Sequence, residues 1–368
     1  MSCYAIYRLP HTTQAVRLTQ SEGQPETTPS YTELNGKEGF VFAPFSPSED
    51  CPILLLKPDR YETFHIDADN NSGSENYTLH TTSENGNGRD TYSGDFARFH
   101  SKLCNGEYSK LVLARCSREK NTTTASHEQL FARACRLYPR LFIALVSTPQ
   151  GGTWLMATPE ILLEGKDNTF ATMALAGTMR LDDTQLGFDT QGCDPYPNTI
   201  KWDSKNIQEQ EYVAAYIKER INRFSDNIKQ NGPYTARAGR IVHLRTDFSF
   251  TLHDTGHIGD VINSLHPTPA VCGIPKDKAR RFILDNETDR RKYYSGFCGP
   301  LSHNGETHLY VSLRCMEITE KIFCLHAGGG LLDKSEEQHE WDETEYKMDT
   351  MRWVINTNQE KCTATRKM

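Results

Sequence analysis

The sequence predicts an α+β fold with antiparallel or mixed sheets. Short apolar segments clearly outnumber the stretches with helical periodicity, and the two kinds do not alternate strictly, as they would around a parallel sheet. The chain has 368 residues, of which 37% are hydrophobic, and this is ample for a large core. No Pro-rich or Ser-rich linker divides it into separate domains.

The expected elements follow from these patterns in chain order. Strands are predicted at the short apolar segments, which are residues 110–115, 141–147, 154–157, 161–164, 240–243, 309–314 and 322–326. Helical spacing predicts a helix at residues 127–137. Two polar stretches, residues 67–89 and 181–199, are predicted to be loops.

A second helix is predicted from Lys205 to about Phe224, where apolar side chains recur at helical spacing. Glu209 falls on the apolar stripe of this helix, where a carboxylate is costly unless it is paired or bound to a cation. From this helix alone, a buried ion pair with Arg or Lys is the simpler interpretation. The alternative is a Mg²⁺ site, because Mg²⁺ usually takes one or two carboxylates together with water and ligand oxygens.

A third helix is predicted near the end of the chain, after an apolar strand and a glycine run at residues 328–330. Ser335 and Gln338 have the spacing of a capping box at its start. At about 100° per residue, Glu340, Glu343 and Lys347 share one narrow arc beside the apolar face. This arrangement suits a hard cation held together with an anionic ligand, and ordinary exposed Glu–Lys pairs are the alternative. The acidic residues of the opposite face are expected to be solvated: Asp342, Glu345 and Asp349.

Composition excludes several classes of protein. The net charge is −7 and there is no basic block, so nucleic acid is not an expected partner. Eleven cysteines lie singly, with no Cys-x-x-Cys pair, which favours reduced thiols in the cytoplasm over disulfides or a zinc site. No apolar run is long enough to cross a membrane, so no membrane association is expected.

A series of segments in fixed order resembles the chorismate-utilising enzyme family and, within it, isochorismate synthases most. The segments are residues 105–115, 157–160, 174–178, 205–209, 243–246, 265–270 and 293–299, then Arg314, and Glu340 with Glu343 and Lys347. The resemblance covers roughly residues 95–355. It implies a single large domain of packed sheets flanked by helices. Residues 1–94 would be a variable N-terminal portion of this fold, and residues 95–368 the chorismate-binding catalytic portion.

The resemblance implies a Mg²⁺-dependent isomerisation of chorismate to isochorismate, in which water adds to the ring and the allylic hydroxyl leaves. Lys110 is then the base for the incoming water, and Glu160 is the acid for the departing hydroxyl. A lysine base must be uncharged, which burial or nearby positive charge favours, and Glu160 must keep its proton.

The same resemblance assigns the binding groups. Glu209 and Glu343 would hold Mg²⁺, and Glu340 would support the metal directly or through water. Arg314 would clamp the carboxylate of the enolpyruvyl arm in a bidentate pair. The other expected substrate contacts are Ala176, Gly177, Thr178, His243, Thr268, Tyr294, Gly329 and Lys347.

Alternatives within the family differ in the nucleophile and in the fate of the first product. Anthranilate-forming members use ammonia from a glutaminase and lack a lysine at the base position, so Lys110 argues for water and against a glutaminase partner. Salicylate synthases, the second possibility, share the lysine and also eliminate pyruvate. A third is a partner-dependent chorismate-binding subunit, because Asn206 and Gln210 depart from the family pattern beside Glu209, as Cys272 does elsewhere. We expect a monomer or weak homodimer whose product serves menaquinone or siderophore synthesis.

Overall fold

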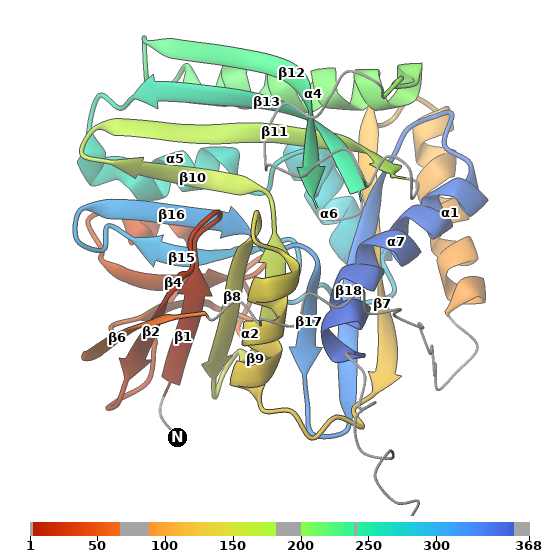
Figure 1. The fold of residues 1–368 in the computed structure, drawn as a ribbon. Helices are drawn as coiled ribbons and strands as arrows, with labels where there is room; N and C mark the ends of the chain where they lie inside the picture. Colours follow the sequence, from red (N-terminus) through yellow and green to blue (C-terminus); the bar gives the residue numbers. More distant parts are fainter. Residues whose placement is uncertain (1–2, 67–87, 182–199, 239–240, 357–368) are drawn as a thin grey trace, which may run out of the picture.

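The computed structural model describes residues 3–66, 88–181, 200–238 and 241–356. Within these ranges the strands form two nine-stranded sheets with antiparallel pairing (Figure 1). The α+β class predicted from the sequence is therefore confirmed. No helix among the described residues is long and apolar enough to cross a membrane.

The first sheet contains the strands that carry Lys110 and the glycine run at residues 328–330. Its order is β14 (Gly273–Ile274), β7 (Lys110–Lys120), β18 (Ile322–Leu331), β17 (Cys315–Ile318), β9 (Gly152–Thr158), β8 (Phe142–Thr148), β1 (Cys3–Arg8), β2 (Gln14–Gln20) and β6 (Arg60–His65). Strand β18 pairs with β7 along its whole length but with β17 only as far as residue 326. The glycine run therefore has no strand on its other side in the described structure, which leaves room for side chains from helices.

The second sheet carries residues 174–178, which include the predicted substrate contacts Ala176, Gly177 and Thr178. Its order is β12 (Ile228–Ala238), β13 (Ile241–Thr251), β11 (Thr169–Arg180), β10 (Ile161–Lys166), β16 (Glu306–Val311), β15 (Phe297–Leu301), β4 (Gly39–Ala43), β5 (Ile53–Leu56) and β3 (Glu26–Thr28). In Figure 1, β10–β13 run across the view while β7, β17 and β18 run down it. The strands of the two sheets therefore run in different directions.

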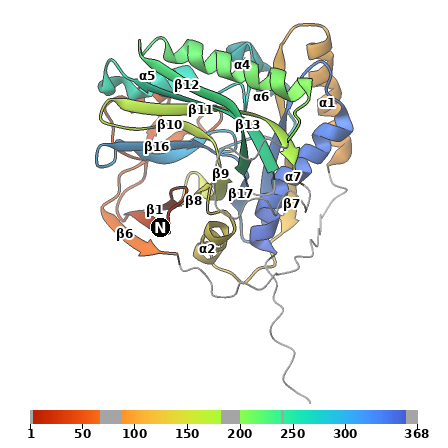
Figure 2. The same ribbon diagram turned by 45° about the horizontal axis from the view of Figure 1, so that its top comes forward.

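Six α-helices lie in the described ranges: α1 (Arg89–Cys104), α2 (His127–Leu137), α4 (Ser204–Ile221), α5 (Ile258–Leu265), α6 (Lys276–Asn286) and α7 (Glu337–Ile355). Short 3₁₀ turns occur at Tyr31–Leu34 and Thr255–His257. Helix α4 packs along β11 and β13 (Figure 2), and α7 packs along β18 (Figure 1). These two helices therefore bring their glutamates to the region where the two sheets meet.

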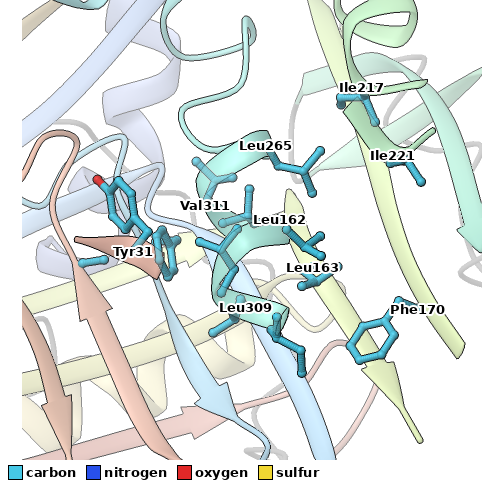
Figure 3. Packing of buried hydrophobic residues seen from close by; sticks show 14 of the residues in the cluster. Tyr31, Leu162, Leu163, Phe170, Ile217, Ile221, Leu265, Leu309 and Val311 are labelled. Carbon is cyan, nitrogen blue, oxygen red and sulfur yellow. The ribbon is translucent and has the colours of Figure 1, made fainter. Parts of the chain in front are cut away.

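A buried hydrophobic cluster fixes α4 on the second sheet. Ile217 and Ile221 of α4 belong to the same cluster as Leu265 of α5 and as Leu162 and Leu309 of the sheet (Figure 3). Full burial of each such side chain contributes about 1.5–3 kcal/mol. Because the cluster involves the apolar stripe predicted for this helix, it also determines where the inward Glu209 points.

Most predicted elements agree with the structure, and the differences are local. Helix 127–137 is α2, which has a true capping box between Ser126 and Gln129. The strand expected at 309–314 ends at Val311, and Arg314 lies in a turn with a positive φ of 44°. The loops predicted at 67–89 and 181–199 fall largely outside the described residues.

The N-terminal residues contribute strands to both sheets: β1, β2 and β6 to the first, and β3, β4 and β5 to the second. Helix α1 runs across residue 94, where the sequence suggested a boundary between a variable and a catalytic portion. That division stays a prediction.

Candidate active site

A cavity that is partly open to solvent is lined by residues of both sheets and of helices α4 and α7. Nine of the residues predicted to form the site line it: Glu160, Ala176, Gly177, Thr178, Glu209, His243, Tyr294, Arg314 and Lys347. Gly328 and Gly330 of the glycine run also line it. The sequence assigned no role to the other lining residues, which are mostly apolar: Val112, Pro159, Leu175, Ala270, Val271, Leu313, His326 and Ala327. The predicted Lys110, Thr268, Gly329, Glu340 and Glu343 lie just behind this wall, as their contacts show.

Lys110 and Glu209 form a buried ion pair at the glycine run. Lys110 is the first residue of β7 and is fully buried, and its Nζ lies 2.9 Å from Oε1 of Glu209 on α4, outside hydrogen-bonding geometry. A Cβ atom at Gly330 would lie 2.2 Å from that same oxygen, so only glycine allows this close approach. Burial opposes ionisation of Glu209, but Lys110 and Lys205 outweigh it and lower the pKa of the carboxyl.

Glu340 of α7 is buried behind the glycine run. Its Oε1 accepts from Lys205 Nζ at 2.5 Å and from Ser335 Oγ at 2.8 Å. Its Oε2 has no hydrogen-bond partner among the described residues, and a Cβ at Gly329 would lie 3.0 Å from it. Burial raises the pKa of Glu340 to about 7, although Lys205 acts in the opposite direction. The sequence did not assign a role to Lys205, which is 135 positions away from its partner.

Glu343 and Lys347 form the predicted i, i+4 pair on α7. Lys347 Nζ donates to Glu343 Oε1 at 2.7 Å and to the carbonyl oxygen of Gly328 at 2.8 Å. This lysine therefore ties α7 to β18 and places its ammonium group at the cavity wall. The common arc predicted for Glu340, Glu343 and Lys347 agrees with these contacts.

Two details predicted for α7 are wrong. Ser335 does not cap the helix: α7 begins after Glu336 with no side-chain capping bond, and the Ser335 hydroxyl donates to Glu340 instead. The opposite face is not simply solvated, because Glu345 forms ion pairs with Arg115 and Arg352. Both errors arise because packing against β7 and β18 offers these side chains partners that local sequence does not show.

Arg314 occupies the other side of the cavity. Its Nη1 donates to the Ala238 carbonyl oxygen at 2.9 Å, and its Nη2 contacts Nε2 of His243. The other ring nitrogen, Nδ1, lies 2.9 Å from the carbonyl oxygen of Gly177 and is assigned as the donor. The ring is therefore neutral, in agreement with burial and the Arg314 charge holding the pKa of His243 well below its usual range.

The charge of Arg314 is not matched. Burial lowers the pKa of its guanidinium to about 10, which still leaves it cationic at neutral pH. No carboxylate of the described residues lies within ion-pair distance of it. A buried cation that has only neutral partners suits an anionic ligand, and a guanidinium binds a carboxylate especially well.

Glu160 follows β9 and is almost fully buried at the same cavity. Thr268 Oγ1 donates to its Oε1 across a long contact of 3.4 Å. Burial raises the pKa of Glu160 to about 8, and the nearby Lys110 charge opposes this shift only in part. The carboxyl is therefore mostly protonated at neutral pH, as a general acid must be.

Residues 174–178, which the resemblance identifies as a substrate loop, form an irregular part of β11. Gly177 has a φ of 71°, in the left-handed region that favours glycine, and the pairing with β13 shifts register here. The backbone N–H of Thr178 donates to Asn206 Oδ1 at 3.1 Å. Asn206, which departs from the family pattern, therefore anchors this loop to α4.

Two further residues, Gln210 and His326, lie close to the residues predicted for the site. Gln210, the other departure beside Glu209, is buried and donates to Ala174 O and Thr246 Oγ1, so it fastens α4 to the second sheet. His326 is a lining residue that the sequence did not single out. Its ring stacks on Tyr294 at 5.5 Å, and the only sequence signal was its position before the glycine run.

The carboxylates around the glycine run have the donor chemistry for Mg²⁺. Three glutamates from α4 and α7 meet β18, and Glu340 Oε2 is a buried oxygen without a partner among the described residues. Carboxylate oxygens are the protein ligands that Mg²⁺ prefers. As the described part of the chain stands, no group of three His, Cys, Asp or Glu side chains is arranged to hold a metal, and each glutamate contacts a lysine. The residues therefore fit the ion, provided that the lysines make room for it.

The fold and the cavity define an α+β enzyme-like domain with a site for an acidic ligand. Residues 53–356 match the profile of the family described as chorismate binding enzyme. The chain belongs to this family. The resemblance seen in the sequence is therefore confirmed at the level of the family.

Two curated relatives show which members of the family this chain is similar to. The chain is 27% identical over 253 residues to isochorismate synthase MenF of Escherichia coli, which covers 69% of this chain and 57% of that protein. It is 32% identical over 204 residues to the salicylate biosynthesis isochorismate synthase of Pseudomonas aeruginosa, covering 55% of this chain and 42% of that protein. The chain thus matches about half the length of these curated relatives.

A solved structure extends the likeness in fold to nearly the whole chain. The crystal structure of DhbC from Bacillus anthracis superposes on this chain with a TM-score of 0.77 at 20% identity. The superposition covers 97% of this chain and 96% of that one. The packed antiparallel sheets with flanking helices are therefore the fold of that structure too.

Proposed function

We propose that the protein is a Mg²⁺-dependent isochorismate synthase that isomerises chorismate by adding water and releasing the allylic hydroxyl. One observation carries the proposal. A buried arginine without a carboxylate partner among the described residues, Arg314, and a buried carboxyl that keeps its proton, Glu160, line the same cavity. The first supplies a site for an anionic arm, and the second supplies an acid, which are two requirements of the reaction.

Binding is divided between the two sides of the cavity. Arg314 would bind the enolpyruvyl carboxylate, while His243 holds the guanidinium in place through its neutral ring. Lys347 would lie near the ring carboxylate. When bound, Mg²⁺ would be held by Glu209 and Glu343, with Glu340 in support, and would neutralise the charge of the ring carboxylate.

Proton transfer would use Lys110, which lies against Gly330, and Glu160, which lines the cavity. Lys110 would take the proton of the incoming water, and Glu160 would give its proton to the departing hydroxyl. In the structure Lys110 is in ion-pair contact with Glu209, so the ammonium must lose this partner and its proton before it can act as a base. Thr268 orients the Glu160 carboxyl through its hydroxyl.

The test is chromatography of chorismate incubated with the purified chain and Mg²⁺. Accumulation of isochorismate is expected, and excess EDTA should abolish it. Equal amounts of salicylate and pyruvate, with only transient isochorismate, would show a salicylate synthase instead. Absence of turnover by the single chain, despite chorismate binding, would favour a partner-dependent subunit.

Calorimetry tests the shared site directly. If the ring carboxylate binds beside the metal, Mg²⁺ and chorismate must each tighten the binding of the other by the same factor, about 5–150-fold for typical coupling. Chorismate affinity that does not change with Mg²⁺ would contradict the shared site.

The biological setting is also a proposal. Isochorismate feeds both menaquinone and siderophore synthesis, and growth of a deletion strain with added menaquinone precursor or iron would separate the two. A cytoplasmic location, the absence of a glutaminase partner and a monomeric or weakly dimeric state stay predictions. Light scattering of the purified chain would measure the last of these.

A further inference from the structure

Lys205 is a charged residue of the site region that the proposed reaction does not use. It lies in the first turn of α4, four residues before Glu209, and it does not line the cavity. Its side chain is 23% exposed, and its Nζ lies 2.5 Å from Glu340 Oε1. The ammonium therefore bridges α4 and α7 behind the glycine run.

The carboxylate that Lys205 holds does not need the lysine for its position. Ser335 Oγ donates to the same oxygen of Glu340 at 2.8 Å, and α7 itself fixes the backbone of the residue. The second oxygen, Oε2, faces the backbone of Gly329 and has no partner among the described residues. Glu343 Oε1 approaches the same glycine, since a Cβ there would lie 3.6 Å from it.

Lys205 instead balances the negative charge of the carboxylates at the glycine run. Three acidic side chains converge on β18, and buried or half-buried carboxylates repel one another unless cations lie among them. Lys110, Lys205 and Lys347 supply one cation to each. Of these lysines, Lys347 lines the cavity and Lys110 contacts the cavity-lining Glu209, whereas Lys205 contacts Glu340, which lies behind the cavity wall.

We propose that Lys205 is a counter-ion that competes with Mg²⁺ for Glu340, so that it sets the metal affinity of the site and offsets the repulsion between the carboxylates when no metal is bound. This inference rests on the proposed metal site. When the cation enters, Lys205 moves its ammonium toward solvent, and Ser335 keeps Glu340 in position. Lys205 thus acts through Glu340: it lowers the metal affinity of the site and stabilises the site when no metal is bound.

The experiment is titration calorimetry of the full chain with MgCl₂ alone, in the absence of chorismate. Lys205→Gln removes the charge but keeps a hydrogen-bonding amide, and Lys205→Arg keeps the charge. We expect Lys205→Gln to bind Mg²⁺ about tenfold more tightly than the unsubstituted chain, within the usual range of coupling between neighbouring sites. Lys205→Arg should bind it with the original affinity within a factor of about three.

Thermal melting gives a second readout that a purely structural lysine would not produce. In EDTA, Lys205→Gln should melt below the unsubstituted chain, because Glu340 loses its cation. Saturating Mg²⁺ should restore the melting temperature. Lys205→Met, which keeps the unbranched stem, provides the same comparison if the amide variant does not fold, and Ser335→Ala shows the effect of losing only the neutral hydrogen bond.

The outcomes separate this inference from the proposed function. If Lys205→Gln binds Mg²⁺ as weakly as the unsubstituted chain, or more weakly, the lysine positions Glu340 for the metal and the competition is wrong. If the unsubstituted chain binds no Mg²⁺ at all, with or without chorismate, the proposed metal site fails, and the exchange of lysine for metal fails with it.

Discussion

The two sides of the cavity balance charge in different ways. The side formed by α4, α7 and β18 contains three ion pairs: Lys110–Glu209, Lys205–Glu340 and Lys347–Glu343. On the other side, Arg314 contacts a carbonyl oxygen and a neutral imidazole. On the first side each carboxylate is paired with an ammonium group, whereas the second side has a positive charge without a carboxylate partner among the described residues.

The difference indicates what each side can accept. An unmatched buried cation stabilises an incoming carboxylate strongly, because no existing ion pair has to be broken first. On the side where every carboxylate is already paired, a cation can bind only if it displaces an ammonium group. Substitutions on the two sides should therefore differ in whether they affect catalysis, ligand affinity or stability.

The largest effect should come from Lys110→Ala. Loss of the base should lower kcat by about 10²–10⁴-fold, because the group acts mainly in the transition state. Chorismate affinity in calorimetry should stay within a few-fold, and this measurement also confirms that the variant is folded. Lys166→Ala, which removes an exposed ion pair with Glu306, is the matched control. Near-normal turnover of Lys110→Ala would show that the base is another group.

Arg314→Ala should weaken chorismate binding on the unmatched side. A hydrogen bond to a charged group contributes about 1.5–3 kcal/mol, so the dissociation constant should rise about 10–100-fold. Arg223→Ala, which removes an exposed arginine paired with Glu219, should leave the constant unchanged. Equal affinities of Arg314→Ala and the unsubstituted chain would mean that the substrate carboxylate binds elsewhere.

The pH dependence should report Glu160. Its pKa is raised from 4.5 to about 8, so the protonated acid is present below pH 8 and is lost as the pH rises through that value. We expect kcat to fall about tenfold per pH unit above pH 8. The same shift means that the folded protein holds this proton longer than the unfolded chain, so its contribution to stability decreases between pH 4.5 and 8. Glu160→Gln should remove this decrease in stability between pH 4.5 and 8, and a decrease that persists in the variant would contradict the assignment.

The smallest effect should be the stability change of Glu343→Gln. The pair with Lys347 is half-buried, with side chains 18% and 19% exposed, and its loss should change the free energy of unfolding by less than about 1 kcal/mol. Glu209→Gln, by contrast, leaves the fully buried Lys110 without its carboxylate and should cost about 3–5 kcal/mol. Urea unfolding in EDTA measures both, and equal effects would mean that burial does not distinguish the two pairs.

The sequence alone determined several of the elements and which way the glutamates of α4 and α7 point. Helical periodicity placed Glu209 on the apolar stripe of α4 and put Glu340, Glu343 and Lys347 on one arc of α7, and the contacts agree with both. Such faces are predictable because they depend only on the 3.6-residue repeat of a helix. The ordered segments also identified the family, since side chains that contact one ligand recur at fixed places along the chain.

Only the tertiary structure decided the partners. Lys205 contacts Glu340, which lies 135 positions away in the sequence. Ser335 contacts the same carboxylate and does not cap α7 as expected. Arg314 lies in a turn with a positive φ and not in a strand. These contacts depend on how α4 and α7 pack against β11 and β18, and no local pattern encodes that packing. The protonated state of Glu160 has the same origin, because its pKa is raised by burial that the surrounding strands create.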